Sequence, residues 1–286
     1  ATQVKLIVTG GAGFIGSAFV RTTLAAEPAT SILVLDKLTY AGNLDNLSPV
    51  AGDPRYRFVQ GDICDAALVE GLLREDRPDA IIHFAAESHV DRSIHAPTPV
   101  FDTNLCGTFT LLEAIRANPV GRFVHVSTDE VYGSIDEPHE ADENYPLVTA
   151  SPYSAAKAGS DLLALAYAKT YKLPISVTRA SNNYGPYQFP EKLIPLMISN
   201  ALDGRKLPVY GDGQQVRDWL YVDDHCAAIR AVLQQGRVGE VYNIGGNCSL
   251  ANLEVVRRIL AATGQSEELI EYVADRPGHD RRYALT

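Results

Sequence analysis

Short apolar, often β-branched runs recur along the first two thirds of the chain and alternate with longer segments of helical periodicity. A run apolar along its whole length predicts a strand buried on both faces, as in a parallel sheet. The expected strands are residues 4–8, 32–35, 56–59, 80–84, 122–126 and 175–179. The alternation of strands with amphipathic helices predicts an α/β fold with a doubly wound, parallel sheet of Rossmann type.

The pattern changes after residue 180, where shorter helices alternate with shorter strands. The expected helices are residues 191–203, 223–235 and 250–262, and the expected strands are 207–210, 241–244 and 270–273. We therefore predict a Rossmann domain in residues 1–179. A smaller mixed α/β lobe in residues 180–286 is expected to be interleaved with it rather than to fold separately.

A glycine-rich turn links the first strand to the first helix, which runs to about residue 26. It reads T-G-G-A-G-F-I-G at residues 9–16 and includes Gly10 and Gly13. Such a turn lets a helix N-terminus approach a pyrophosphate, because its free N–H groups and dipole favour an anion. The second strand ends at Asp36, twenty positions after Gly16. An acidic residue there accepts hydrogen bonds from the hydroxyls of the adenosine ribose. It would repel a 2′-phosphate, so NAD is favoured over NADP.

Polar residues that can do chemistry gather between residues 127 and 157. Ser127, Thr128, Asp129 and Glu130 follow the fifth strand, and Tyr153 and Lys157 lie four apart in a segment of helical pattern. That spacing places both side chains on one helix face. A lysine ammonium and a positive nicotinamide ring would favour the phenolate of Tyr153, which could then take a proton from an alcohol. With the glycine-rich turn, this arrangement predicts alcohol–ketone redox chemistry.

Composition argues against several classes of function and location. The 286 residues carry a net charge of −10, which argues against a basic face that binds nucleic acid. Four widely spaced cysteines argue against a zinc site or disulfides, so no metal is predicted and a reducing, cytoplasmic location is expected. No apolar segment approaches about 20 residues, so we expect neither a membrane span nor a signal peptide.

The sequence resembles the extended short-chain dehydrogenases/reductases over essentially its whole length, and within them the dTDP-glucose 4,6-dehydratases. The resemblance lies in D-K-L-T-Y-A-G-N at 36–43, A-A-E-S-H-V-D-R-S-I at 85–94, S-T-D-E-V-Y-G at 127–133 and Y-S-A-A-K at 153–157. N-N-Y-G-P-Y-Q at 182–188, P-E-K-L-I-P at 190–195 and R-P-G-H-D-R-R-Y at 276–283 continue it. The adjacent Asp129-Glu130 pair is the most specific part, because related 4-epimerases and decarboxylases usually lack it.

The resemblance implies site residues by their matching positions. The implied NAD site comprises Gly10, Gly13, Phe14, Ile15, Asp36, Lys37, Leu38, Thr39, Gly42, Asp62, Ile63, Phe84, Ala85, Ala86, Ser88, Thr103, Ser127, Tyr153, Lys157 and Asn182. The implied nucleotide-sugar site comprises Ser88, Thr128, Asn182, Glu191, Lys192, Leu193, Pro208, Tyr210, Arg217, Asn252 and His279. The implied catalytic residues are Thr128, Asp129, Glu130, Tyr153 and Lys157.

The implied reaction is a redox-neutral dehydration of dTDP-glucose to a 4-keto-6-deoxy sugar. Tyr153 deprotonates the 4-hydroxyl, Glu130 takes the C5 proton, and a protonated Asp129 donates to the departing C6 hydroxyl. Two adjacent carboxyls with different protonation states can divide acid and base roles in this way. The alternatives are a UDP-sugar 4,6-dehydratase, a nucleotide-sugar 4-epimerase or decarboxylase, and a non-catalytic NAD-sensing protein.

The resemblance also implies a homodimer formed through helices at 97–117 and 151–171, with Leu162, Leu163 and Tyr167 as extra apolar surface. In the family the chain usually continues through a further helix, whereas this sequence stops at Thr286. On that basis we expect a C-terminally incomplete nucleotide site. Among the basic residues of the lobe, Arg217 is the preferred partner for a diphosphate.

Overall fold

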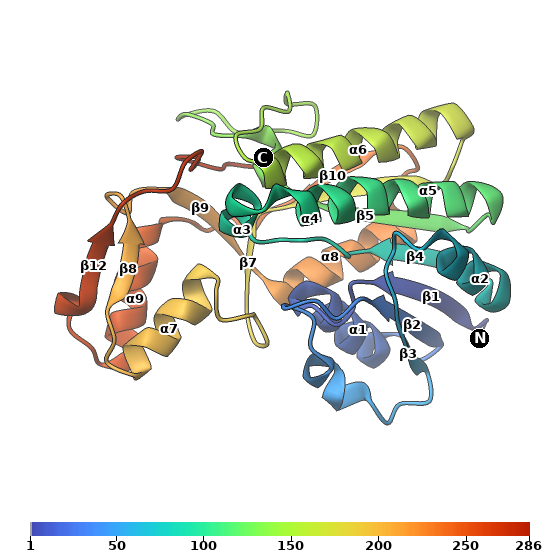
Figure 1. The fold of residues 1–286 in the computed structure, drawn as a ribbon, viewed down its shortest axis with the longest axis horizontal. Coiled ribbons are helices and arrows are strands. Elements are labelled where there is room, and N and C mark those ends of the chain that lie inside the picture. Colours follow the sequence, from blue (N-terminus) through green and yellow to red (C-terminus); the bar gives the residue numbers. More distant parts are fainter. Residues whose placement is uncertain (1) are drawn as a thin grey trace.

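A seven-stranded sheet forms the centre of the larger lobe in the computed structural model, which describes residues 2–286 (Figure 1). Its strands lie in the order β10-β6-β5-β4-β1-β2-β3, and every neighbouring pair is parallel. The strands are β1 (Val4–Thr9), β2 (Thr30–Asp36), β3 (Tyr56–Gln60), β4 (Ala80–His83), β5 (Arg122–Thr128), β6 (Ile175–Ala180) and β10 (Val241–Ile244). The predicted Rossmann-type sheet and all its expected strands are confirmed.

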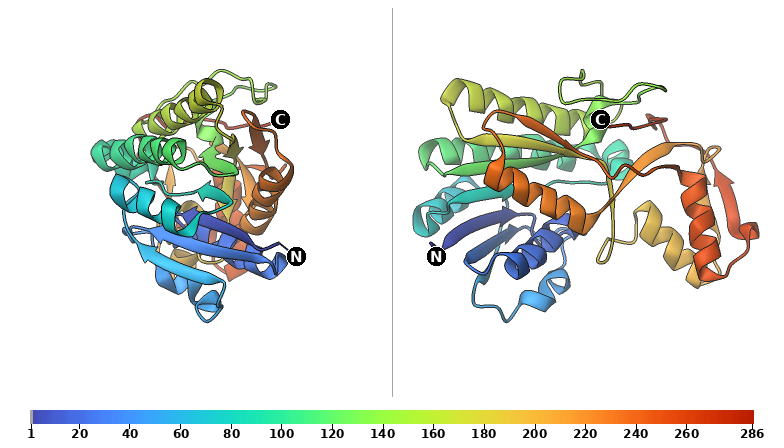
Figure 2. Two further views of the ribbon diagram at one scale, coloured as in Figure 1. Left: turned by 90° about the vertical axis from the view of Figure 1, so that its right-hand side faces the viewer. Right: turned by 180° about the vertical axis from the view of Figure 1, so that it is seen from behind.

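Helices cover both faces of this sheet, as Figures 1 and 2 show. Helices α1 (Phe14–Ala26) and α8 (Val222–Gln235) cover one face, where they pack on Val8 and Val34. Helices α2 (Ala66–Asp76), α5 (Thr108–Ala117) and α6 (Pro152–Tyr171) cover the other, where they pack on Ile7 and Ile81. Successive strand residues point to opposite faces, so each strand supplies both layers of the core.

The helix expected at 97–117 is interrupted. It consists of α4 (Pro97–Phe101), a π-helical turn (Asp102–Gly107) and α5, and the short α3 (Val90–His95) precedes it. Buried Asn104, in the π turn, accepts a hydrogen bond from the Glu87 N–H at 2.8 Å and donates one to the Glu87 carbonyl at 2.9 Å. The turn thus fixes the loop that follows β4.

The smaller lobe lies at the carboxyl edge of the sheet (Figure 1). Its core combines Met197, Leu207, Trp219 and Val256. Its elements are α7 (Leu193–Leu202), α9 (Asn252–Thr263), β7 (Asn182–Tyr184), β8 (Leu207–Tyr210), β9 (Val216–Tyr221), β11 (Ser249–Ala251) and β12 (Ile270–Val273). Strands β8 and β12 pair in parallel, and β9 lies between β7 and β11. Short 3₁₀ helices occur at Leu44–Val50, Asp129–Tyr132 and Glu267–Leu269.

The chain passes between the lobes more than once. Helix α8 packs on α1, and β10 pairs with β6, so two elements beyond residue 180 belong to the large sheet. The division into residues 1–179 and 180–286 stays a prediction. Helix α8 and strand β10 show how residues beyond 180 are interleaved with the larger lobe. Across residues 2–286, no helix combines the length and apolarity needed to cross a membrane.

Candidate active site

One long cavity of about 310 Å³ follows the carboxyl edge of the sheet. It runs from the glycine-rich turn and Asp36 to Tyr153 and Lys157, and then to the loop after β7. Predicted NAD-site residues that line it are Gly10, Gly13, Phe14, Ile15, Asp36, Lys37, Thr39, Gly42, Asp62, Ile63, Phe84, Ala85, Ala86, Ser88, Thr103, Ser127, Tyr153, Lys157 and Asn182. Leu38 is the one predicted NAD-site residue outside the lining; it packs partly buried against the α1–α8 side of the core.

The glycine-rich turn needs its glycines for steric reasons. Gly10 has φ +71°, and a Cβ there would lie 2.6 Å from the Ala85 nitrogen. A Cβ at Gly16 would lie 2.2 Å from the Gly10 carbonyl oxygen. No side chain caps the N-terminus of α1 at Gly13. The backbone cradle and uncapped helix end therefore fit a dinucleotide pyrophosphate.

Asp36 is buried and already holds part of this cradle. Its carboxylate accepts hydrogen bonds from the Ala12 N–H at 2.9 Å and the Leu38 N–H at 2.8 Å. Burial raises the pKa of Asp36, and the two backbone bonds oppose that rise. Each oxygen has a second lone pair, so the same carboxylate can accept ribose hydroxyls.

Asp62 has no part in capping α2. The side chain of Asp65 caps that helix by accepting from Leu68 N, whereas Asp62 pairs with Lys37 at 3.1 Å at the rim of the cavity. The helix cap is thus supplied by Asp65, which leaves Asp62 free to serve the cavity.

Tyr153 and Lys157 lie on α6 as the spacing predicts. Ser151 and Ser154 form a capping box, and Pro152 occupies the first turn. Both Tyr153 and Lys157 are buried, and Lys157 Nζ donates to the Val126 carbonyl at 2.9 Å. Burial raises the pKa of Tyr153 well above its usual value, and the charges of Glu130 and Asp129 raise it further. Burial lowers the pKa of Lys157.

The Asp129-Glu130 pair opens a 3₁₀ turn directly after β5. Thr128 is the N-cap and accepts from the Glu130 N–H at 3.2 Å, so neither acid is needed as a cap. Asp129 is 2% exposed, and its Oδ2 has no hydrogen-bond partner in the described chain. Burial and the charge of Glu130 raise the pKa of Asp129 well above the usual carboxyl value. The site thus favours a protonated Asp129 beside Glu130.

A buried polar layer beneath these residues was not predicted. Asp161, one turn beyond Lys157, accepts from Arg179 Nε at 2.9 Å and contacts His125 Nε2 at 3.0 Å. All three side chains are almost fully buried. Arg179 and His125 fall inside apolar strands, so their periodicity gave no signal of this cluster. The layer supplies one carboxylate close to the Lys157 ammonium.

Further cavity residues were also missed as site residues. Ser181, Asn183, Gln188, Phe189 and His225 line the same cavity as Tyr153. The loop after β6 reads as polar in the sequence, which was a usable signal for Asn183 and Gln188. His225 gave none, because it lies in an ordinary amphipathic helix.

The predicted nucleotide-sugar residues divide into two groups. Ser88, Thr128, Asn182, Glu191 and Lys192 line the cavity. Leu193, Pro208, Tyr210, Arg217, Asn252 and His279 lie in the smaller lobe and its C-terminal segment, outside the cavity lining. The first group therefore lies together with the predicted catalytic residues in the cavity. The second group lies farther out, on the smaller lobe.

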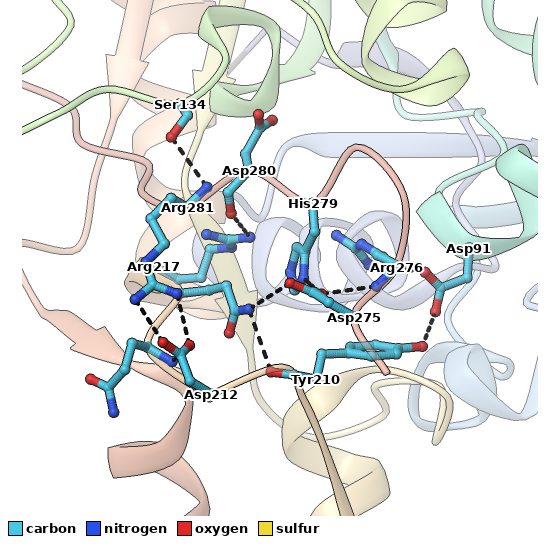
Figure 3. Close-up of polar contacts among 12 residues, drawn as sticks. Asp91, Ser134, Tyr210, Asp212, Arg217, Asp275, Arg276, His279, Asp280 and Arg281 are labelled. Atoms are coloured by element: carbon cyan, nitrogen blue, oxygen red, sulfur yellow. Dashed lines mark hydrogen bonds and ion pairs between the residues drawn. The ribbon is translucent and has the colours of Figure 1, made fainter. Parts of the chain in front are cut away.

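A polar network fastens the segment 275–281 to both lobes (Figure 3). Asp91 of α3 accepts from Tyr210 Oη at 2.8 Å and from Arg276 Nη1 at 3.1 Å, and His279 pairs with Asp275. Within residues 2–286, Arg217 makes hydrogen bonds only to main-chain carbonyls, those of Val216 and Asp280, although it is 5% exposed. Its charge remains available to an anion.

Comparison with known proteins agrees with this geometry. The chain matches the family described as GDP-mannose 4,6 dehydratase over residues 7–286. It is 54% identical to a dTDP-glucose 4,6-dehydratase of an Actinoplanes species, over 99% of this chain and 89% of the relative. The crystal structure of dTDP-glucose 4,6-dehydratase from Streptomyces venezuelae with NAD bound superposes with a TM-score of 0.96 at 56% identity, covering 99% and 88% of the two chains.

The fold is also shared with enzymes of other names. UDP-glucose 4-epimerase from Thermus thermophilus superposes with a TM-score of 0.91 at 32% identity, covering 99% of this chain and 90% of the epimerase. The higher identity lies with the dehydratases, in accord with the Asp129-Glu130 pair. The resemblance seen in the sequence is confirmed, and the chain belongs to the GDP-mannose 4,6 dehydratase family, in the group of the dTDP-glucose 4,6-dehydratases.

Proposed function

We propose that this chain is an NAD-dependent dTDP-glucose 4,6-dehydratase, which converts dTDP-glucose to dTDP-4-keto-6-deoxyglucose and water. The observation that carries the proposal is the placement of Asp129 and Glu130 in one cavity with Tyr153 and Lys157. The last two serve alcohol oxidation on this fold, whereas the first two are needed for elimination. The names of the dTDP-glucose 4,6-dehydratases compared above supply the thymidine nucleotide.

The residues at the sheet edge fit a dinucleotide. The glycine-rich turn would hold the pyrophosphate and Asp36 the adenosine ribose, while Lys157 would hold the second ribose. When bound, NAD supplies a hydride acceptor for C4 of the sugar and later a hydride donor for C6. Asp36 would repel a 2′-phosphate, which favours NAD over NADP.

Tyr153 carries the first proton transfer. Its phenolate takes the proton of the 4-hydroxyl while Thr128 and Ser127 orient that hydroxyl. Burial and the neighbouring carboxyls raise the pKa of Tyr153, so the base form depends on nearby positive charge. The Lys157 ammonium provides such charge, because it lies four positions after Tyr153 on one face of α6.

Glu130 and Asp129 carry the elimination. The 4-ketone acidifies the C5 proton, which Glu130 accepts, and protonated Asp129 donates to the C6 hydroxyl so that water leaves. Glu130 then returns its proton to C5 as C6 is reduced. Tyr153 ends with one extra proton and Asp129 with one fewer, and exchange with solvent resets both.

The smaller lobe would bind the nucleotide. Arg217 is its best diphosphate partner, because Arg276, Arg281 and Arg205 already pair with carboxylates. Its guanidinium also lies 4.2 Å from the centre of the Tyr283 ring, which holds it in place. Tyr210, Asn252 and His279 would complete the outer wall.

A homodimer through α4, α5 and α6 is the second part of the proposal. Phe101, Phe109 and Leu162 are exposed on these helices, as a contact surface requires. Tyr167 was expected to add to that surface, but it is 7% exposed and packs in the core, so it adds little. Sedimentation equilibrium should give twice the chain mass, and a monomer at micromolar concentration would refute the dimer.

Incubation with dTDP-glucose tests the main proposal. The expected product is the 4-keto-6-deoxy sugar nucleotide, identified by its mass loss of one water and by NMR of the C6 methyl group. Formation of dTDP-galactose would show an epimerase instead. Equal or faster turnover of UDP-glucose would contradict the thymidine assignment.

A further inference from the structure

Several polar atoms at one end of the cavity lack partners. His225 Nε2, Gln188 Oε1 and Ser181 Oγ are shielded from solvent, and none has a hydrogen-bond partner among residues 2–286. All three side chains line the cavity. A buried polar atom without a partner is costly in free energy, so three of them in one place indicate a site for a ligand.

The hydrogen bonds around His225 fix which ring nitrogen carries the proton. Asn183 Nδ2 donates to the Ser181 carbonyl at 3.0 Å, which leaves Asn183 Oδ1 as an acceptor 2.8 Å from His225 Nδ1. His225 Nδ1 therefore carries the hydrogen. Burial lowers the pKa of His225 to about 3, so the imidazole is neutral at neutral pH. Nε2 then presents a lone pair to the cavity.

Gln188 presents the same chemistry. Its Nε2 donates to the Asn183 carbonyl at 3.2 Å, so its unpartnered Oε1 is the acceptor that faces the cavity. The Ser181 hydroxyl can accept as well. A ligand for this corner must consequently bring hydrogen-bond donors rather than a negative charge, which excludes the phosphate groups of a dinucleotide.

The corner lies at the end of the cavity opposite Asp36. Ala180, at the end of β6, pairs with Thr128 of β5, whereas Asp36 ends β2 on the other side of β1. His225 reaches the corner from α8 on one face of the sheet, and Tyr153 from α6 on the other. A dinucleotide with its adenosine at Asp36 would place its nicotinamide here.

We propose that His225 and Gln188 accept hydrogen bonds from the carboxamide NH₂ of the nicotinamide and so fix which ring face meets the sugar. The carboxamide nitrogen has two hydrogens to donate, one for each acceptor. The nicotinamide ribose hydroxyls are expected at Lys157, on the α6 side. The inference rests on the NAD site of the proposed function and adds the residues that orient the reactive ring.

A dinucleotide without these donors tests the proposal. In 3-acetylpyridine adenine dinucleotide a methyl group replaces the carboxamide NH₂. Both dinucleotides are used to displace radiolabelled NAD from the holoenzyme, which measures relative affinity without turnover. The wild-type protein should prefer NAD by about ten- to a hundredfold, as expected for two hydrogen bonds at about 1 kcal/mol or somewhat more each.

Gln188→Leu and His225→Leu should each reduce this preference by about three- to tenfold. NAD affinity should fall while that of the analogue stays close to the wild-type value. Gln188 is a half-buried loop residue, so its variant folds whatever happens to buried His225. Gln214→Leu is the matched control, because Gln214 is exposed and outside the cavity lining.

Four results would overturn the inference. Equal weakening of both dinucleotides would give the two residues a structural role only. Equal binding of both dinucleotides by the wild-type protein would show that the carboxamide NH₂ is not the donor. Variants that keep the NAD preference but raise KM for dTDP-glucose would assign the acceptors to the sugar. Failure of the wild-type protein to bind NAD at all would refute the proposed function as well, which separates the two failures.

Discussion

The catalytic end of the cavity and the network in Figure 3 treat their polar groups in opposite ways. At the catalytic end, Ser127 Oγ, Asp129 Oδ2 and His225 Nε2 are buried without partners in the described chain. In the network, most charged groups pair with one another; Asp91, for example, accepts from both Tyr210 and Arg276. The first region keeps its polar atoms ready for a ligand, whereas the second pairs most of its charged groups within the protein, with Arg276 Nε as an unpartnered exception among residues 2–286.

The difference teaches where binding free energy is gained. A ligand at the catalytic end meets polar atoms that have no partner among residues 2–286, so its hydrogen bonds contribute almost fully to the binding free energy. A ligand at the network must replace bonds such as that between Tyr210 and Asp91, so its net gain is small. Substitutions at the two regions should therefore differ strongly in size.

Tyr153→Phe should have the largest effect. The ring remains to fill the site, but no hydroxyl is left to take the proton of the 4-hydroxyl. We expect kcat to fall by about 10²–10⁴-fold, the usual contribution of a positioned base. Steady-state kinetics measure it, and retained NAD at an unchanged melting temperature is the control. A loss below tenfold would show that another group accepts the proton.

Asp129→Asn should divide the reaction. Elimination should slow by about a hundredfold or more, because an amide is a far weaker acid, while oxidation at C4 continues. Reduced nicotinamide should then accumulate on the enzyme and be visible in single-turnover absorbance. Loss of both steps to the same extent would contradict the assignment of Asp129 to the departing hydroxyl.

The raised pKa of Asp129 adds a pH dependence with a definite sign. Burial favours the protonated form of Asp129. The contribution of Asp129 to the free energy of unfolding is therefore fully present below the ordinary carboxyl pKa. That contribution is lost as the pH rises through the raised pKa. The rate of elimination should decline over the same upper window, whereas the stability of Asp129→Asn should no longer show this decline. Thermal unfolding of both proteins across pH provides the measurement.

Arg217→Lys tests the charged group that the network leaves without a carboxylate. A lysine keeps the charge but loses the planar fork, so KM for dTDP-glucose should rise by about tenfold with little change in kcat. Competition with dTDP alone would measure the same loss. An unchanged KM would indicate that another cation of the smaller lobe binds the diphosphate.

Arg281→Ala should have the smallest effect. Its partner Asp212 is exposed, and ion pairs of exposed groups contribute little. We expect kcat/KM within about twofold of the wild-type value and a melting temperature within about 1 °C. A large loss here would erase the contrast between the two regions.

Much of the large sheet is predictable because its signal is local. Runs such as residues 4–8 are apolar along their whole length, and polar residues such as Asp36 and Ser127 follow where strands end. Since the carboxyl ends of parallel strands meet at one edge, these residues had to converge. The four-position spacing of Tyr153 and Lys157 placed both side chains on one face of α6 for the same local reason.

The remainder depends on contacts distant in sequence. His225 gave no signal because its role arises from the packing of α8 on α1 and from Asn183. The π turn in the helix expected at 97–117 follows from buried Asn104 and its bonds to Glu87, not from periodicity. Tyr167 is buried because α5 packs against α6, and the pattern of α6 alone does not show that contact.

The return of α8 and β10 to the large sheet has a consequence for synthesis on the ribosome. Val222 and Ile229 of α8 complete the core around Val8 and Val34, and β10 covers the open edge of β6. A nascent chain that ends near residue 180 would expose that apolar face and the β6 edge, where another chain could pair. Such a chain would need chaperone protection until the ribosome had released the segment through residue 244.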